Sequence, residues 1–243
     1  MDHQTLFEIP ASSDSWHLGR RVGFDLETTD RDPRVARIVS AAIVVVDPAA
    51  AQDPAQTPVR VREWLVDPGV EIPAETTAIH GITTEHAQAE GQLAAEAIPQ
   101  IVHALSQESD LGAPIIVFNA PYDLRVLAQE AERHGADLPV VTSVIDPLVI
   151  DKQVDRFRRG KRTLSFLCEH YQVILDDAHS AAADAWAAVE VGDALAARFP
   201  QVQIPAAELH GMQVEWKVEQ AASLQEYFRR TRPDAVVDPG WPM

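Results

Sequence analysis

The first third of the chain has the hydrophobic pattern of β-strands. In residues 20–27, apolar side chains at every second position alternate with glycine or carboxylates, which predicts a strand with two different faces. Residues 38–46 form a nearly continuous apolar run that is typical of a buried strand, and residues 59–66 predict a third strand. The prolines and alanines of residues 48–58 indicate a loop. Three strands joined by short connections predict an antiparallel meander.

The rest of the chain alternates between helical and strand patterns. Residues 67–89 are rich in proline, glycine and threonine and predict a loop. A helix is expected next, with Ile98, Ile101, Val102 and Leu105 at helical spacing and Pro99 either in its first turn or kinking it. The elements expected after this helix are a strand at 115–118, a helix from Pro121 to about His134, a strand at 139–145, a helix that starts at Leu164, and a helix over 181–199. This order predicts an α/β fold with a mixed β-sheet flanked by helices.

Segment boundaries divide the chain into three parts. Residues 1–17 lack periodicity and predict a loosely held lead-in, and residues 18–200 form the main domain. Prolines 200 and 205 mark the start of a helical extension over 201–243. Its apolar stripe is expected to dock onto the domain or, alternatively, to bind a protein partner; it consists of Leu209, Met212, Trp216, Leu224 and Tyr227.

Composition narrows the classes of function. With a net charge of −17, the chain is a poor candidate for broad, non-specific duplex binding, which depends on Lys and Arg. An enzyme that binds only a strand end remains compatible, since metal ions can supply positive charge locally. The single cysteine excludes an internal disulfide. No signal-peptide pattern or apolar run of about 20 residues occurs, so we expect a soluble, cytoplasmic protein with no membrane contact.

The first strand ends in two carboxylates. Asp25 and Glu27 are two positions apart and share one face of the strand, roughly 7 Å from each other. They repel each other unless a cation lies between them, and hard divalent cations take oxygen ligands of this kind. The alternative is an exposed strand end with two solvated acids.

Two later segments carry further acids. Asn119 predicts a helix N-cap and Asp123 complements the helix dipole, but the preceding strand would bring Asp123 to the sheet end beside Asp25. His179 precedes a helix that Ser180 can cap, with Asp184 in its early turns. The pair is either a surface histidine with a dipole-matched acid, or a proton acceptor with a metal ligand.

In chain order, these segments resemble the three motifs of the DEDDh family of 3′–5′ exonucleases, which includes the proofreading epsilon subunit of bacterial DNA polymerase III. The segments are FDLETT at 24–29, NAPYD at 119–123 and HSAAAD at 179–184, and the resemblance spans residues 20–199. It implies a ribonuclease-H-like fold, with His179 as the general base and four metal-ligating acids, Asp25, Glu27, Asp123 and Asp184.

The resemblance also implies a cofactor, a substrate and a setting. These are two Mg²⁺ or Mn²⁺ ions, a single-stranded or frayed 3′ end of DNA, nucleoside 5′-monophosphate products, and a role in DNA replication, repair or proofreading. An alternative enzymatic activity is that of an exoribonuclease or an oligonucleotide-clearing enzyme. A rival from another class is a non-catalytic nucleic-acid-binding or replication-assembly module, in which the C-terminal extension binds a polymerase or repair partner.

Further residues are candidates for substrate binding: Thr28, His80, Asn119, Arg158, Arg159, Lys161 and Arg162. His80 belongs to a His-Gly-Ile-Thr segment common in the family, although it is equally compatible with a glycine turn. The basic loop is either a phosphate-binding site or a solvated charge run. The chain departs from the family at Asp30, where glycine is usual. Asp146 predicts a helix cap before Pro147.

Overall fold

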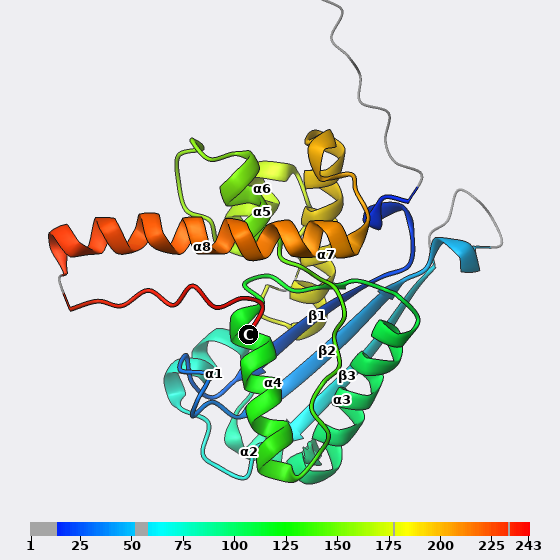
Figure 1. The fold of residues 1–243 in the computed structure, drawn as a ribbon. Helices are drawn as coiled ribbons and strands as arrows, with labels where there is room; N and C mark the ends of the chain where they lie inside the picture. Colours follow the sequence, from blue (N-terminus) through cyan, green and yellow to red (C-terminus); the bar gives the residue numbers. More distant parts are fainter. Residues whose placement is uncertain (1–13, 52–57, 177, 233) are drawn as a thin grey trace, which may run out of the picture.

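A computed structural model describes residues 14–51, 58–176, 178–232 and 234–243. These residues build a six-stranded sheet with the strand order β4-β3-β2-β1-β5-β6 and helices on both faces (Figure 1). The strands are β1 (Arg21–Thr28), β2 (Ile38–Val46), β3 (Val59–Asp67), β4 (Gln92–Leu93), β5 (Ile115–Ile116) and β6 (Val144–Ile145).

The pairing of the strands confirms the predicted mixed sheet. β1 pairs antiparallel with β2, and β2 pairs antiparallel with β3, so the meander is as expected. β5 lies parallel to β1, and β6 lies parallel to β5. Because β1 and β5 are parallel, their carboxyl ends lie at the same edge of the sheet.

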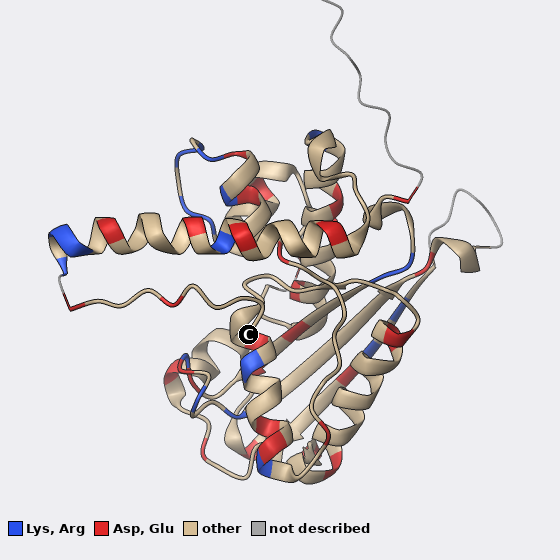
Figure 2. Ribbon diagram, viewed as in Figure 1, with Lys and Arg blue, Asp and Glu red and all other residues tan. Residues whose placement is uncertain are grey.

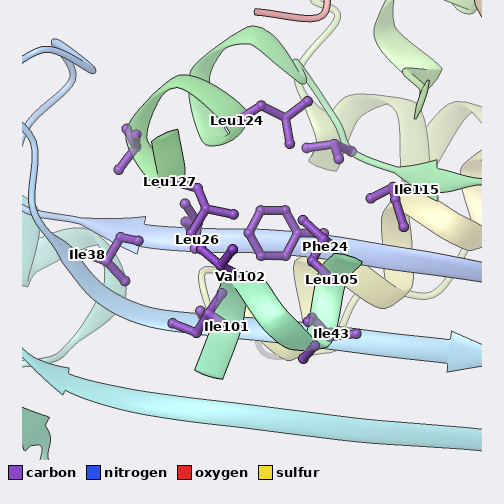
Figure 3. Close-up of a cluster of buried hydrophobic side chains, with 14 of the residues drawn as sticks. Phe24, Leu26, Ile38, Ile43, Ile101, Val102, Leu105, Ile115, Leu124 and Leu127 are labelled. Atoms are coloured by element: carbon purple, nitrogen blue, oxygen red, sulfur yellow. The ribbon is translucent and has the colours of Figure 1, made fainter. Parts of the chain in front are cut away.

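The two faces of β1 serve different purposes. Phe24 and Leu26 are buried beneath α3 (Ala94–Asp110) and α4 (Pro121–His134), where aliphatic side chains surround them (Figure 3). Gly23 and Asp25 point to the opposite face, which α7 (Ala181–Arg198) covers. A Cβ on Gly23 would lie 2.3 Å from the carbonyl oxygen of Ala185, so glycine permits the helix to pack directly on the strand. The start of α7 thereby lies close to the carboxylates of β1.

Several predicted elements are wrong in detail. The expected loop at 67–89 contains α1 (Ala74–His80) and α2 (Thr84–Glu90). The strand expected at 139–145 is reduced to β6. Of the two positions expected for Pro99, the one in the first turn is excluded, because Pro99 lies inside α3. Asp146 caps α5 (Pro147–Val154) as predicted, and α6 (Leu164–Tyr171) begins where expected. The expected loop at 48–58 lies largely outside the described residues.

The segments at both ends of the chain pack on the domain. Trp16 is only 3% exposed and its indole N–H donates to the carbonyl of Val202 at 3.0 Å, so the end of the expected lead-in is not loose. Residues 1–13 lie outside the described part. α8 (Ala206–Thr231) crosses above the sheet, with Leu209 buried at its start and Leu224 exposed nearer its end (Figure 1). In the part of the chain that the structure describes, no helix is long and apolar enough to cross a membrane.

Candidate active site

The carboxylates at the end of β1 lie in a buried, strongly negative environment. Burial raises the pKa of Asp25, and the neighbouring carboxylates of Asp123, Asp184 and Glu27 raise it further. Burial and the charge of Asp184 also raise the pKa of Glu27 to about 8. The register with β2 shifts between Glu27 and Thr28, a strand irregularity of the kind that often re-aims side chains beside active sites.

Asp123 reaches the same place from the other face of the sheet. It lies in the first turn of α4, is only 4% exposed, and accepts the backbone N–H of Leu26 at 3.2 Å. This donor of β1 is available because β5 pairs with β1 only at Val22 and Gly23. Burial raises the pKa of Asp123 as well. A strand that ends early thus leaves a backbone donor that fixes the carboxylate.

Asn119 does not cap α4, so the predicted capping role is wrong. The N-cap residue is Ala120, and Asn119 has a left-handed φ of 63°. The backbone N–H groups of both residues donate to the buried carboxylate of Asp146, each at 3.1 Å. The turn before Asp123 is therefore held by an acid that lies 27 residues along the chain.

The third segment brings a histidine and the fourth acid to the cluster. His179 lies just before α7 with φ of 73°, and its backbone N–H donates to Asp184 Oδ1 at 3.4 Å. Ser180 occupies the N-cap position, though its side chain makes no capping hydrogen bond. Ligand atoms of Glu27, His179 and Asp184 all lie within 4.8 Å of one another. The structure thus brings together all five residues that the sequence motifs single out.

This arrangement can bind divalent cations through oxygen atoms. Four carboxylates come from three distant segments, and burial raises the pKa of every one of them. Such a cluster is unfavourable while its charges repel each other and lack hydration. Mg²⁺ and Mn²⁺ prefer carboxylate oxygens, so the donor set fits these ions.

Thr28 takes part in a hydrogen-bonded group that also explains how Asp30 is accommodated. The Thr28 hydroxyl donates to the backbone carbonyl of Asp30 at 3.1 Å, and Tyr122 OH contacts the same two residues. The Asp30 carboxylate accepts the N–H of Asp32 at 2.8 Å, within its own exposed loop. Asp30 has no positive φ, so glycine is not needed there. Tyr122 was missed as a site residue, although it lies inside the second motif.

His80 lies in a cleft of about 580 Å³ that it shares with His179 and Trp64. Its Nδ1 accepts the backbone N–H of Ile82 at 3.1 Å, so the ring proton is on Nε2. Burial lowers the pKa of His80 and keeps it neutral. Its Nε2 is buried, and a backbone hydrogen bond with Thr28 opposes the effect of burial on the pKa. His80 therefore links the wall of this cleft to the end of β1, beside the acidic cluster.

The basic loop is fixed by a buried acid. Arg158 and Arg162 both form ion pairs with Asp151, which is fully buried in α5. Lys161 lies 5.4 Å from the ring centre of Phe166, and Arg159 is exposed. Two of the four candidate phosphate-binding residues in this loop are therefore already paired within the protein. The sequence analysis missed Asp151, because in this segment it predicted only the helix cap at Asp146.

Comparisons with known proteins agree with this geometry. The family profile RNase_T, described as exonuclease, matches residues 22–191. A DNA polymerase III subunit epsilon-like protein of Rhodobacter capsulatus is 32% identical over 136 residues, which cover 53% of this chain and 17% of that protein.

Solved structures with a similar fold include E. coli exonuclease I. Its complex with a dT13 oligonucleotide has a TM-score of 0.61 at 18% identity, and its complex with dA16 has 0.65 at 19%. Both matches cover 76% of this chain and 42% of that chain. The chain thus spans less than half the length of the proteins it is compared with. Because the profile covers most of the chain and all three motifs, this protein belongs to the exonuclease (RNase_T) family and is of the DEDDh type.

Proposed function

We propose that the chain is a metal-dependent 3′–5′ exonuclease that hydrolyses phosphodiester bonds at the 3′ end of DNA and releases nucleoside 5′-monophosphates. The observation that carries this proposal is the approach of Glu27, His179 and Asp184 to within 4.8 Å of one another. Asp25 and Asp123 lie beside them. DNA as the substrate is supported by the oligonucleotides bound in the exonuclease I structures, dT13 and dA16.

The acids divide into ligands for two divalent ions. Asp25, Glu27 and Asp184 would hold one ion, and Asp25 with substrate oxygens would hold the other. Asp123 would support them directly or through water. When bound, Mg²⁺ or Mn²⁺ offsets negative charge at the phosphate and makes a bound water more acidic. The raised pKa values of the buried acids support this role, because they reflect negative charge without a counterion.

The other residues handle protons and the substrate. A ring nitrogen of His179 accepts the proton of the attacking water, since its exposed imidazole lies at the mouth of the acidic cluster. The hydrogen bond from its backbone N–H to Asp184 keeps it at this position. His80 lines the same cleft as His179 and would contact the terminal nucleotide there.

Digestion of end-labelled oligonucleotides tests the proposal. With Mg²⁺ we expect a 5′-labelled strand to shorten one nucleotide at a time, and a 3′-labelled strand to lose its label at once. Chelation of the metal or Asp184→Asn abolishes digestion, and His179→Ala slows it at least 100-fold. Asp137→Asn and His103→Ala are matched controls, because both residues are exposed and lie away from the cluster. Full activity of Asp184→Asn would refute the assignment.

The same assay with matched RNA separates the rival activities. We expect DNA to be digested faster. Faster digestion of RNA would make the chain an exoribonuclease instead. Metal binding without digestion of either strand would leave a binding module that has lost catalysis.

A further inference from the structure

Positive charge is concentrated in one region of this acidic chain. Ten of the twenty Lys and Arg residues lie within residues 152–162 and 217–232, while the whole chain carries a net charge of −17. These two segments are the basic loop, with the end of α5, and the second half of α8. Figure 2 shows their cationic positions gathered at the same end of the molecule. Such a local excess of cations favours a polyanion.

A cleft of about 400 Å³ lies between these segments. This volume is within the range of sites for small organic ligands. One wall is basic and belongs to α5 and the loop, and the other belongs to α8; the residues of interest are Lys152, Arg156, Arg162, Gln220, Leu224 and Tyr227. Tyr227 is 59% exposed and can offer a ring face to a planar ligand.

Several groups in the cleft have no ion-pair or hydrogen-bond partner among the residues that the structure describes. Lys152 and Arg156 form no ion pair with any described residue, whereas Arg162 is paired with Asp151. Gln220 donates from Nε2 to the carbonyl of Val149 at 3.0 Å, but its Oε1 is buried without a hydrogen bond among the described groups.

The positive charge in the cleft is only partly compensated. Burial and the nearby charges of Lys217 and Arg162 lower the pKa of Lys152, while the carboxylates of Asp146 and Asp151 act in the opposite direction. Glu219, on the rim, is the acidic residue among those that line the cleft. Glu219 and Asp151 thus offset only part of the positive charge of the cleft, and among the described residues the Gln220 oxygen has no donor. A nucleotide combines an anion and a hydrogen-bond donor with a flat base that can stack on Tyr227.

The cleft is separate from the acidic cluster but joined to it by α5. This helix begins at Asp146, whose carboxylate holds the turn before Asp123. Gln213 of α8 accepts the N–H of Asp146 at 2.7 Å, and Gln220 lies two turns further along the same helix, at the cleft. The seven residues from Gln213 to Gln220 rise roughly 10 Å along α8. We therefore expect a strand whose 3′ end enters the acidic cluster to reach the cleft within a few nucleotides.

We propose that this cleft binds single-stranded nucleic acid a few nucleotides upstream of the 3′ end that is cut. Lys152 and Arg156 bind its phosphates, Tyr227 stacks on a base, and Gln220 accepts a hydrogen bond from a base N–H group. The function of the site rests on the proposed exonuclease activity, but binding to it does not. The second half of α8 thus serves as a platform for the strand, and not as a docking surface for a protein.

The proposal predicts an effect that depends on the length of the strand. The full chain is compared with Lys152→Gln/Arg156→Gln and with Tyr227→Ala. The assays are fluorescence anisotropy with a labelled dT12 strand in chelator, and digestion of dT12 and dT3 with Mg²⁺. The control, Arg60→Gln/Arg198→Gln, removes the same charge from exposed positions outside the cleft and outside residues 152–162 and 217–232. Thermal melts verify that each variant is folded.

We expect the Lys152→Gln/Arg156→Gln variant to bind dT12 at least tenfold more weakly than the wild type, and Tyr227→Ala at least fivefold more weakly. The ratio of kcat/KM for dT12 to that for dT3 falls at least tenfold in the double cleft variant. It changes less than twofold in the control. Affinity should also depend less steeply on salt in the double variant, because fewer phosphates are neutralised.

Three outcomes would overturn the proposal. Unchanged dT12 affinity in the cleft variants would show that the strand does not reach the cleft and would leave α8 open to a polymerase or repair partner. An equal loss of dT12 affinity in the control variant would show that the effect depends only on the net charge of the protein and not on the cleft. If dTMP alone displaces dT12 at the same nucleotide concentration, the ligand is a free nucleotide and not a strand. Failure of the exonuclease assignment is distinct, because wild-type protein would then cut neither dT12 nor dT3.

Discussion

Replacing Gly23 by alanine should damage catalysis although the residue makes no contact with the substrate. Gly23 is two residues before Asp25 on β1, and its missing side chain lets the backbone of Ala185 approach. An added Cβ would lie 2.3 Å from the Ala185 oxygen and 2.9 Å from Val189 Cγ2. Val189 can change rotamer, but the backbone carbonyl cannot. Because ordinary van der Waals contact starts near 3.4 Å, α7 and β1 must separate by roughly 1 Å.

This displacement changes the acidic cluster directly. Asp184 precedes Ala185 on α7, so it moves away from Asp25 and Glu27 as the helix shifts. A misplacement of about 1 Å can cost on the order of 100-fold in rate. The overpacked contact also lowers the free energy of unfolding by about 1–3 kcal/mol. We therefore expect kcat/KM to fall roughly 100-fold in a protein that is still folded.

The measurement is kcat/KM on an end-labelled oligonucleotide, together with urea denaturation. Gly19→Ala is the matched control, because a Cβ at that position has nothing within 4 Å and φ is negative there. It should retain kcat/KM within twofold. A folded Gly23→Ala protein with wild-type kcat/KM would refute the idea that close packing of α7 on β1 sets the geometry of the site.

Three further predictions concern the buried polar groups. Asp146→Asn replaces a carboxylate oxygen by an amide group that cannot accept the N–H of Ala120. The free energy of unfolding, measured by urea titration, should therefore drop by about 2–3 kcal/mol. An unchanged free energy of unfolding would contradict the conclusion that Asp146 holds the turn before Asp123. Asp25→Asn removes a repelling buried charge and should raise the melting temperature in chelator, whereas Mg²⁺ should stabilise the wild type only. His210 accepts the N–H of Val144, and burial lowers its pKa below 6.5, so the unfolded chain binds a proton that the folded one refuses. The contribution of His210 to the free energy of unfolding is therefore present above pH 6.5 and is lost as the pH falls below that value. In denaturation series between pH 7.5 and 5.5, His210→Gln should make the free energy of unfolding fall less steeply with acidification. An unchanged slope would show that His210 does not contribute to this pH dependence.

The strands that form the centre of the sheet could be predicted from the sequence because burial imposes a short, regular pattern on them. β1 has one apolar face and β2 is apolar on both faces, and both patterns can be recognised without knowing which elements pack against the strands. The grouping of the motif residues was predicted through their resemblance to the DEDDh family, and the structure places ligand atoms of Glu27, His179 and Asp184 within 4.8 Å of one another.

Elements that bury little could not be found by hydrophobic period. α1 contains no buried residue and α2 buries only Ala87, so neither shows an apolar face. The available signals were terminal: Thr83 caps α2 by accepting the N–H of His86, and Gly81 ends α1 with φ of 77°. Proline and glycine around these short helices predicted a loop instead.

Other errors come from side chains that are distant in the sequence. Val140 and Thr142 have strand-like residue types, but their N–H groups donate to the hydroxyls of Ser106 and Ser109 on α3, so the strand is shortened. Asn119 is a good N-cap residue by local preference, yet Asp146 takes its N–H and that of the next residue. Neither competition is visible in a local pattern.

The central claim is that acids from three segments bind divalent cations together. An anomalous difference map from Mn²⁺-soaked crystals of the wild-type protein tests it most directly. We predict Mn²⁺ peaks bounded by Asp25, Glu27 and Asp184, which disappear in Asp184→Asn crystals soaked in the same way. Well-occupied Mn²⁺ elsewhere on the molecule, with none among these carboxylates, would contradict the account.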